Sequence, residues 1–534
     1  MGEIRLLDCT LRDGGYINDW NFGHDNLVNV FERLVDAGVD IIEVGFLDER
    51  RKFDINRSIM PDTESVGRIF GELDRKSSMV VGMIDYGTCS LSNILPAEDS
   101  FLDGIRVIFK KHLREQAMEY CGELGALGYK VFAQLVSVTS YDDGEMLDLV
   151  RLANKYKPYA VSMVDTYGLM HQNNLMHYFK LLDDNLDPAI GLGYHAHNNF
   201  QMGYANCIAM LSNKIERTMI VDGSVYGMGK SAGNAPTELI AMHMNASLGK
   251  DYRISQMLEA IDSSIIQFYA PAAWGYNMFY YLAASNDCHP SYVAYLMDKR
   301  TLSVRSINEI LGRLEGEKKL LYDKNYIEKL YLDYEKNEIN DEEDRLALVK
   351  VLKGRKILII GPGATMESDA ARERILDYVR EEKPTVISVN YIPKSFRPDY
   401  VFLSNSKRYL QLASKLSRTR QMIIATSNLT ETTDGAFAYR LNYGSLIDLD
   451  TDIIDNSLVM LLKALIGIGI DKVSLAGFDG YSAIKQNYVR EDMEYDFIKD
   501  KAKYLNSYVR GFLRSVKDKI TVEFLTRSRY SDRL

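Results

Sequence analysis

The chain has 534 residues, more than one ordinary domain, and its 46% hydrophobic and 26% charged residues are typical of a soluble globular protein. Its net charge of −10 and the lack of any Lys/Arg block argue against a nucleic-acid partner. No apolar run approaches the roughly 20 residues of a transmembrane helix, the N-terminus lacks a signal-peptide core, and the cysteines are scattered. We therefore expect a cytoplasmic protein with reduced thiols and no membrane partner.

From residue 4 to residue 222 the sequence alternates short, β-rich apolar runs with stretches of helical spacing. His24–Ala37, Leu113–Leu127 and Gly144–Tyr156 are such helical stretches. Eight strand–helix units predict an α/β fold of the (β/α)8 TIM-barrel type over residues 1–245, and a doubly wound open sheet is the alternative. The predicted strands are Arg5–Cys9, Asp40–Gly45, Met79–Ile84, Gly104–Ile108, Lys130–Val136, Ala160–Val164, Ile190–His195 and Arg217–Val221.

The active site of such a barrel lies at the carboxyl ends of its strands. Almost every predicted strand ends in a residue that can bind a metal or move a proton. Several of these residues stand inside otherwise apolar runs, which a solvated loop does not explain. The residues are Arg12, Asp13, Glu43, Asp85, Arg106, Gln134, Asp165, Thr166, His195, His197 and Asp222.

Residues 246–349 show no strand–helix alternation and are rich in aromatic side chains. We predict a helical extension and linker that pack against the barrel. Its aromatic residues either form the core between helices or reach the barrel mouth, and Trp274 and Tyr276 are the best candidates for the second role. An acidic polar stretch, residues 335–344, indicates the boundary that follows.

Residues 350–534 predict a separate, Rossmann-like α/β domain. Lys356–Ile360 is a buried strand, and Gly361-Pro362-Gly363 forms a tight turn before a helix at Ser368–Glu381. The turn lacks the third glycine of a dinucleotide site. The domain therefore either binds a phosphate or a nucleotide sugar, or it serves docking or oligomerisation. Its other predicted strands are Thr385–Val389, Tyr400–Leu403, Met422–Ala425 and Lys472–Ala476.

His195 and His197 are two residues apart on the seventh predicted strand, so both side chains face the same side. Two neutral imidazoles on one side of a strand suit a divalent metal. Asp13 reaches the same rim, because strands one and seven both flank strand eight in a closed barrel. The glycine-rich segment 222–238 after the last strand either closes over a ligand or is a flexible connection.

Five motifs, in order along the chain, resemble the DRE-TIM metallolyase superfamily of HMG-CoA lyase-like proteins. This superfamily includes hydroxymethylglutaryl-CoA lyase, isopropylmalate and homocitrate synthases, and 4-hydroxy-2-oxovalerate aldolase, and the chain looks closest to the last. The resemblance covers roughly the first 300 residues. The motifs are Asp8-Cys9-Thr10-Leu11-Arg12-Asp13-Gly14, Ile42-Glu43-Val44-Gly45-Phe46, Val164-Asp165-Thr166-Tyr167-Gly168, His195-Ala196-His197-Asn198-Asn199 and Gly233-Asn234-Ala235-Pro236-Thr237-Glu238.

The resemblance implies a divalent-metal cofactor. Asp13, His195 and His197 match the family's metal ligands, and Asn234 matches a residue that completes the coordination in some members. Mn²⁺ or Mg²⁺ suits the oxygen-rich half of this set, and Zn²⁺ is the alternative. By the same resemblance the cation acts as a Lewis acid for an enolate.

The resemblance also implies catalytic and substrate-binding residues. Arg12 matches the arginine that stabilises the enolate and binds substrate, and Glu43 matches the acid that supports the arginine or transfers protons. Thr166 matches a hydroxyl that contacts the substrate carboxylate. Bacterial 4-hydroxy-2-oxovalerate aldolases have a proton-carrying histidine at the position of Tyr16. The candidate proton carriers here are therefore Tyr16, His24 and Tyr276.

These observations predict an aldolase that cleaves or forms a 4-hydroxy-2-oxo acid, with pyruvate as one fragment and an aldehyde as the other. We expect it to act as a homo-oligomer. One alternative is an acetyl-CoA-dependent Claisen-type acyltransferase of the isopropylmalate synthase type, and another is a non-catalytic barrel that acts as a scaffold. No cysteine occurs between Ser224 and Asn234, which disfavours hydroxymethylglutaryl-CoA lyase activity.

Overall fold

A computed structural model describes residues 2–270, 273–299, 302–319, 321–394, 396–419, 421–431, 435–448, 455–490, 493–494 and 497–531. The chain divides into two compact units, Met1–Pro290 and Ser291–Leu534, and each is described by itself. The boundaries predicted at residues 245 and 349 stay predictions. Within the described residues, no helix is both long enough and apolar enough to cross a bilayer.

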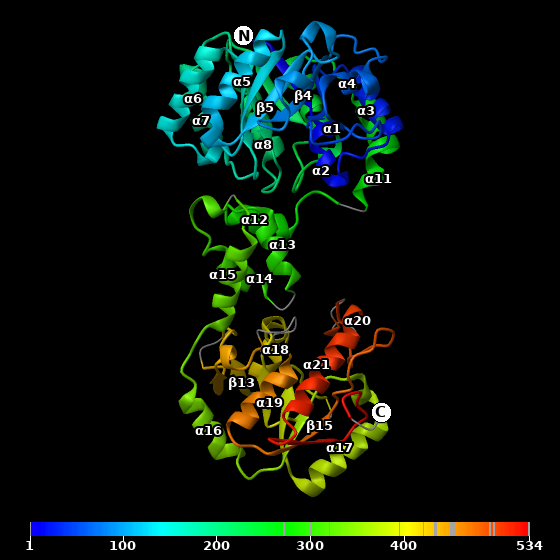
Figure 1. Cartoon of the computed structure of the whole chain (residues 1–534), viewed down its shortest axis with the longest axis vertical. Helices are drawn as coiled ribbons and strands as arrows, with labels where there is room; N and C mark the ends of the chain where they lie inside the picture. Colours follow the sequence, from blue (N-terminus) through cyan, green and yellow to red (C-terminus); the bar gives the residue numbers. More distant parts are fainter. Residues whose placement is uncertain are drawn as a thin grey trace. The chain divides into compact units, whose positions relative to one another are not determined.

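The first unit contains a closed barrel of eight parallel strands (Figure 1). The strand order is β1-β9-β8-β7-β6-β5-β4-β2, and pairing of Leu7 with Ile41 closes β1 onto β2. The TIM-barrel prediction is therefore confirmed. The strands are β1 Ile4–Asp8, β2 Ile41–Leu47, β4 Met79–Asp85, β5 Gly104–Phe109, β6 Lys130–Leu135, β7 Ala160–Asp165, β8 Gly191–Ala196 and β9 Met219–Gly223, with a short β3, Ile59–Met60, added beside β2.

Amphipathic helices surround the barrel. In α3 (His24–Ala37) the buried residues recur at three- and four-residue spacing, and the helix ends at Gly38, whose φ of 81° suits a glycine cap. In contrast, all seven residues of β2 are buried, as expected for a strand covered on both faces. The other helices of this unit are α4 Thr63–Phe70, α5 Arg114–Ala126, α6 Asp143–Tyr156, α7 Gln172–Asn185, α8 Gly203–Leu211, α9 Thr237–Leu248, α10 Ile254–Ala260, α11 Ile266–Tyr269 and α12 Met278–Ser285.

One of the eight predicted strand–helix units lacks its α-helix. Between β4 and β5 the chain forms only two short 3₁₀ turns, Leu91–Asn93 and Ala97–Asp99. The sequence of this connection explains the difference, since residues 86–103 include Gly87, Pro96 and several serine and asparagine residues, which favour turns over helix.

The second unit contains a seven-stranded, fully parallel sheet in the order β14-β13-β12-β11-β10-β15-β16. The prediction of a separate α/β domain with a parallel sheet is confirmed. The five strands expected from the sequence are present, whereas β14 and β16 were not predicted. The bounds are β10 Ile357–Ile360, β11 Thr385–Val389, β12 Tyr400–Leu403, β13 Met422–Thr426, β14 Tyr439–Leu441, β15 Lys472–Ala476 and β16 Thr521–Phe524.

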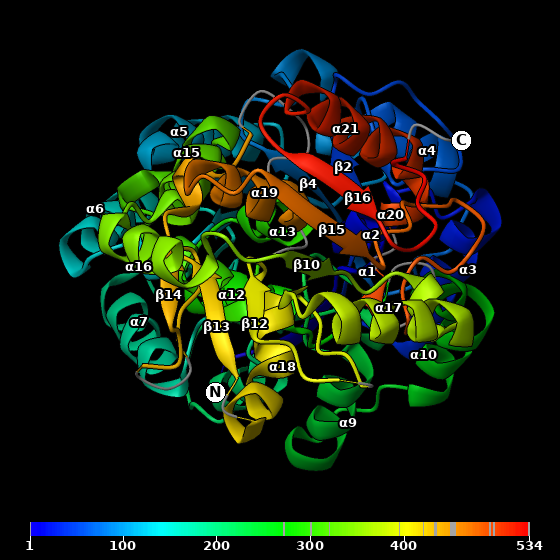
Figure 2. The ribbon, with the colours of Figure 1, turned by 90° about the horizontal axis from the view of Figure 1, so that it is seen from below.

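Helices cover both faces of this sheet (Figure 2). Leu358 and Ile360 of β10 pack on the same side as α17, whereas Ile357 and Ile359 pack on the side of α16, α19 and α21. This alternation follows from the two-residue period of a strand. The helices of the second unit are α14 Val304–Leu311, α15 Lys324–Lys336, α16 Glu342–Leu352, α17 Asp369–Glu382, α18 Ser406–Thr419, α19 Ser457–Gly467, α20 Phe497–Asp500 and α21 Ala502–Ser515, and α13, Pro290–Asp298, begins at the division between the units.

A buried acid in the second unit predicts a pH-dependent stability. Glu335 of α15 is 3% exposed, and its carboxylate accepts a hydrogen bond from Asn428 Nδ2 at 3.2 Å. Burial, together with the charge of Asp455, raises the pKa of Glu335 to about 7 from an ordinary value of 4.5. Between pH 4.5 and 7 the folded chain holds a proton on Glu335 that the unfolded chain has lost. The free energy of unfolding therefore decreases as the pH rises through 7.

We therefore expect Glu335→Gln to stabilise the second unit more at pH 9 than at pH 6. The linkage amounts to about 1 kcal/mol over this range, or a Tm difference of about 2–4 °C. Calorimetric unfolding of the parent and the variant at both pH values measures it. Exposed Glu338→Gln is the matched control, and an equal effect of Glu335→Gln at both pH values would contradict the assignment.

Candidate active site

The first strand delivers two charged side chains to the barrel rim. After β1 ends at Asp8, the chain turns into a short helix, α1 (Thr10–Asp13), and Asp8 fixes this turn by accepting a hydrogen bond from Thr10 N at 2.9 Å. Arg12 and Asp13 are only 5% and 1% exposed, respectively. Both residues are therefore held inside the barrel mouth rather than in a solvated turn.

Asp13 lies close to two histidines, His195 within β8 and His197 just after the carboxyl end of that strand. One ligand atom from each of Asp13, His195 and His197 lies within 4.8 Å of the other two, and all three side chains are buried. The two imidazole rings are 5.1 Å apart between centroids. From the sequence we expected the two histidines to face the same side and the first and seventh barrel strands to lie near each other. The structure brings the three predicted ligands together.

Hydrogen bonds fix the orientation of both imidazoles. His195 Nδ1 lies 3.0 Å from Asp222 Oδ2, and His197 Nδ1 lies 3.1 Å from the carbonyl oxygen of Lys230. Because a carbonyl or an ionised carboxylate can only accept, each Nδ1 carries a proton, and Nε2 is the nitrogen of each ring that this bond leaves for a metal. A histidine whose Nδ1 donates to a carboxylate or a carbonyl is the usual arrangement for a metal ligand.

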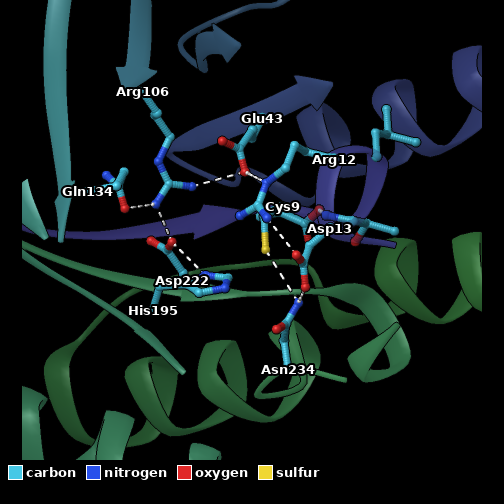
Figure 3. Close-up of polar contacts among 12 residues, drawn as sticks. Cys9, Arg12, Asp13, Glu43, Arg106, Gln134, His195, Asp222 and Asn234 are labelled. Atoms are coloured by element: carbon cyan, nitrogen blue, oxygen red, sulfur yellow. Dashed lines mark hydrogen bonds and ion pairs between the residues drawn. The ribbon is translucent and has the colours of Figure 1, made fainter. Parts of the chain in front are cut away.

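Asn234 completes the cluster on the side of the glycine-rich segment (Figure 3). Its Nδ2 donates to Asp13 Oδ2 at 2.6 Å, whereas its buried Oδ1 has no hydrogen-bond partner among the described residues. Gly229 leaves room for this pair, since a Cβ there would lie 2.6 Å from Asp13 Oδ2. An unpartnered buried oxygen beside a carboxylate and two imidazoles is a donor set that fits a divalent cation.

The charge states of the cluster also suit a cation. Burial is the largest single effect on the pKa of Asp13 and would raise it, but the Arg12 guanidinium, the two histidines and the hydrogen bond from Asn234 together hold that pKa well below its ordinary value. Burial lowers the pKa of His197 to about 3. At neutral pH the site therefore presents a carboxylate and a neutral imidazole, which are the forms that bind metal.

A buried network of ion pairs supports Arg12 (Figure 3). Arg12 donates from Nε to Glu43 Oε2 at 2.8 Å and from Nη1 to Asp13 Oδ1 at 2.5 Å. Arg106 donates to the same Glu43 oxygen at 3.0 Å and also pairs with Asp222. Since Asp222 in turn bonds His195, the network connects the guanidinium of Arg12 to this predicted metal ligand through three side chains, those of Glu43, Arg106 and Asp222. Arg106 and Asp222 are both predicted at the barrel rim from the sequence, but their supporting position in this network is not.

Tyr16 lies on α2 (Gly15–Asn18), and its ring packs against Trp20 with 4.8 Å between centroids. Although Tyr16 is 41% exposed, desolvation by the surrounding residues and the charge of Asp13 raise the pKa of Tyr16 to about 12. The Lys230 ammonium lies 5.2 Å from the centroid of the Tyr16 ring. Among the described residues Lys230 forms no ion pair with a carboxylate, and burial lowers its pKa. The sequence analysis did not single out Lys230, although a lysine within a run of glycines was a usable signal.

The remaining candidates form no hydrogen bond or ion pair with the side chains of this cluster among the described residues. The Thr166 hydroxyl, just beyond β7, accepts a hydrogen bond from Ser137 N at 2.8 Å. His24 begins α3 on a partly exposed surface, and Tyr276 is 62% exposed. Trp274 is buried, and its Nε1 donates to the carbonyl oxygen of Tyr226 at 2.8 Å, so it packs on the glycine-rich segment.

The glycine-rich segment itself is fixed to the end of β8. Asn198 N donates to the carbonyl oxygen of Gly233 at 2.8 Å, and His197 and Asn234 form an isolated antiparallel bridge. Most residues of the segment are buried. Of the two alternatives for this segment, the geometry matches closure over the site rather than a loose connection.

Comparison with known proteins agrees with the predicted resemblance. Residues 108–263 match the HMGL-like family model. The chain is 25% identical over 250 residues to 4-hydroxy-2-oxovalerate aldolase from Marinomonas sp. (strain MWYL1), covering 46% of this chain and 71% of the relative. It is 27% identical over 270 residues to 4-hydroxy-2-oxovalerate aldolase from Stutzerimonas stutzeri, covering 48% and 75%.

Solved structures with a similar fold include an HMG-CoA lyase from Bacillus subtilis. The TM-score is 0.40 at 15% identity, and the match covers 51% of this chain and 94% of the lyase. The N-terminal domain of a Bacteroides vulgatus protein described as an aldolase gives a TM-score of 0.48 at 22% identity, covering 57% and 99%. The family match over residues 108–263 and the aldolase relatives agree with the resemblance to HMG-CoA lyase-like proteins that the motifs predict.

Proposed function

We propose that the barrel is a divalent-metal-dependent aldolase that cleaves or forms a 4-hydroxy-2-oxo acid, with pyruvate and an aldehyde as the two fragments. The observation that carries the proposal is the cluster of Asp13, His195 and His197 at the carboxyl ends of the strands, with Arg12 beside it. The names of the relatives support an aldolase-type reaction.

The ligand set assigns the binding roles. A divalent cation held by Asp13, His195 and His197, with Asn234 Oδ1 as a further donor, would supply Lewis acidity to a chelated 2-oxo acid. The carboxylate and amide oxygens suit Mn²⁺ or Mg²⁺, and Zn²⁺, which imidazoles also bind well, is the alternative.

Arg12 stabilises the negative charge that develops on the pyruvate oxygen when the carbon–carbon bond breaks. Its guanidinium is fixed by Glu43 and Asp13 before substrate arrives, so no reorganisation is needed during the reaction. Glu43 positions Arg12, because its Oε2 accepts from both Arg12 and Arg106. Thr166 is the proposed contact for the substrate carboxylate.

Tyr16 is the proposed carrier of the proton that leaves the 4-hydroxyl. Its high pKa opposes ionisation in the ligand-free chain, whereas the nearby Lys230 and Arg12 cations favour the phenolate. We expect Tyr16→Phe to slow aldol cleavage by about 10²-fold while metal content and pyruvate enolisation change little. Cleavage kinetics and methyl-proton exchange of pyruvate measure the two steps separately. Exposed Tyr276→Phe is the control, and unchanged cleavage in Tyr16→Phe would remove Tyr16 from the reaction.

The direct test of this function is a screen of aldehydes with pyruvate and Mn²⁺, including sugar-derived aldehydes. Formation of a 4-hydroxy-2-oxo acid supports the proposal. A parallel assay supplies acetyl-CoA with 2-oxo acids, and release of free CoA there would favour the acyltransferase instead.

A further inference from the structure

The barrel mouth contains a cation whose position the proposed reaction does not yet explain, the ammonium group of Lys230. This residue follows Gly229 in the glycine-rich segment, and its side chain is partly buried. Among the described residues its Nζ forms no ion pair with a carboxylate and no hydrogen bond with a carbonyl oxygen. Because taking an ammonium group out of water without an anionic partner is unfavourable, such a lysine is a candidate for binding an anionic ligand.

The backbone of Lys230 is fixed at the predicted metal site. Its N–H donates to Asp13 Oδ2 at 3.3 Å, and its carbonyl oxygen accepts from His197 Nδ1 at 3.1 Å. The same oxygen accepts from Gly233 N at 3.0 Å, which closes a turn in the glycine-rich segment. The side chain of Lys230 therefore begins beside two predicted metal ligands, at a point of the chain that hydrogen bonds hold in place.

The side chain of Lys230 extends to the aromatic side of the mouth. Its Nζ lies 5.2 Å from the centroid of the Tyr16 ring, and this ring packs against Phe46 with 6.1 Å between centroids. The cation–π contact offsets part of the cost of burying the ammonium group, but it leaves the N–H donors without an acceptor. Tyr16 is 41% exposed, so the pair of Lys230 and Tyr16 lies where a ligand in the mouth can reach it.

The carboxylates whose charges act on Lys230 do not form an ion pair with it. Asp13 is held by Arg12 and by Asn234 Nδ2. Asp85, at the end of β4, is exposed, so water weakens its interaction with Lys230. The Arg12 guanidinium also acts on Lys230, and it repels the ammonium group. An anionic group of a ligand beside Lys230 would relieve this repulsion and satisfy the free N–H donors.

The position of Lys230 beside Tyr16 relates it to the aldehyde half of the proposed reaction. There Tyr16 takes the proton of the 4-hydroxyl, so the carbon that becomes the aldehyde lies next to the Tyr16 ring. The 2-oxo acid half already has its proposed partners in the cation, Arg12 and Thr166. A cation on the Tyr16 side therefore faces the substituent that the aldehyde carries beyond its carbonyl carbon.

We propose that Lys230 selects an aldehyde with an anionic group, a carboxylate or a phosphate, by pairing its ammonium group with that group. The inference rests on the proposed aldolase function and adds the substrate class to it. The compound that is cleaved is then a 4-hydroxy-2-oxo acid with a second anionic group at its other end. A neutral aldehyde of similar size leaves the ammonium group without a partner, which is the basis of the selectivity.

The test compares matched aldehydes with pyruvate and Mn²⁺ on the full chain. Succinate semialdehyde is compared with 4-methylpentanal, in which an isopropyl group replaces the carboxylate, and glyceraldehyde 3-phosphate is compared with glyceraldehyde. The anionic member of at least one pair should have a kcat/KM at least tenfold higher, and the pair that shows this preference identifies the group as carboxylate or phosphate. Failure to use either anionic aldehyde, or a smaller preference in both pairs, would overturn the proposal.

Variants of Lys230 separate anion binding from its other possible roles. Lys230→Met should decrease the preference for the anionic aldehyde at least tenfold, mainly through a higher KM for that aldehyde, and Lys230→Arg should keep part of the preference because it keeps the charge. Lys180→Met, on the exposed side of α7, is the matched control. Equal losses with anionic and neutral aldehydes would indicate that Lys230 acts only through Tyr16, and a higher KM for pyruvate would indicate that it binds the pyruvate carboxylate. Either result contradicts the proposal.

Exchange of pyruvate methyl protons in the parent, without an aldehyde, distinguishes failure of this inference from failure of the proposed function. Absence of exchange would contradict the proposed function, together with the inference that rests on it. Exchange without a preference for an anionic aldehyde would contradict the role of Lys230 alone.

Discussion

Replacing His197 with alanine should remove the bound divalent metal and lower kcat/KM of aldol cleavage by at least about 10³-fold, or about 4 kcal/mol of transition-state stabilisation. The physical reason is the geometry of the cluster. Among the described residues, Asp13, His195 and His197 form the one group of three His, Cys, Asp or Glu side chains whose ligand atoms all lie within 4.8 Å of one another, and His197 supplies one of these atoms. Metal analysis after dialysis and steady-state kinetics measure the two effects.

The matched control is His177→Ala. His177 is also a histidine of the barrel unit, but it is 53% exposed in its side chain and pairs with Asp143 on the outside. We expect this variant to keep both metal content and activity. Retention of full activity by His197→Ala would contradict the assignment of the metal centre, whereas loss in both variants would indicate a general effect on folding.

The second large effect is expected for Arg12→Met, with a decrease in kcat of about 10²–10³-fold. Arg12 is the only guanidinium that bonds both Asp13 and Glu43 in the described site, and in the proposed reaction it stabilises the developing negative charge. Arg12→Lys keeps the charge but loses the two-armed geometry, so it should recover only part of the rate. Arg5→Met, which removes a surface pair with Glu3, is the control.

We also expect Arg12→Met to change the pH dependence of metal binding. Because Arg12 holds the pKa of Asp13 below its ordinary value, removing the guanidinium should raise that pKa. The carboxylate is the form that binds a cation, so the pH at which metal affinity falls to half should move upward in Arg12→Met. Metal titrations at several pH values measure this shift. An unchanged profile would show that Arg12 does not control the charge of Asp13.

Most of the barrel could be predicted because each strand is a short apolar run followed by a helix, and both signals are local. β7, for example, differs from its predicted range by one residue at its end, and α3 has its predicted bounds. The missing helix after β4 shows the limit of this approach, since regular alternation elsewhere suggested a helix that Gly87 and Pro96 do not favour.

The predicted ligands could be named because strand period and barrel closure place His195, His197 and Asp13 at one rim. The ion-pair network that supports Arg12 could not be predicted, because its contacts join residues far apart in sequence. Arg106 and Asp222 are 116 positions apart, and nothing local to either residue indicates the pairing. The same limit applies to Lys230, whose position over the Tyr16 ring depends on how the glycine-rich segment folds back onto β8.

The most direct test of the proposed barrel chemistry is the exchange of pyruvate methyl protons with deuterium, followed by mass spectrometry in the absence of any aldehyde. This measurement reports enolisation alone, so it does not depend on knowing the second substrate. We predict exchange that requires Mn²⁺ or Mg²⁺, saturates at one metal per chain, and disappears in His197→Ala. Exchange that persists with a chelator, or that is the same in His197→Ala as in the parent, would contradict a metal-dependent pyruvate site at Asp13, His195 and His197.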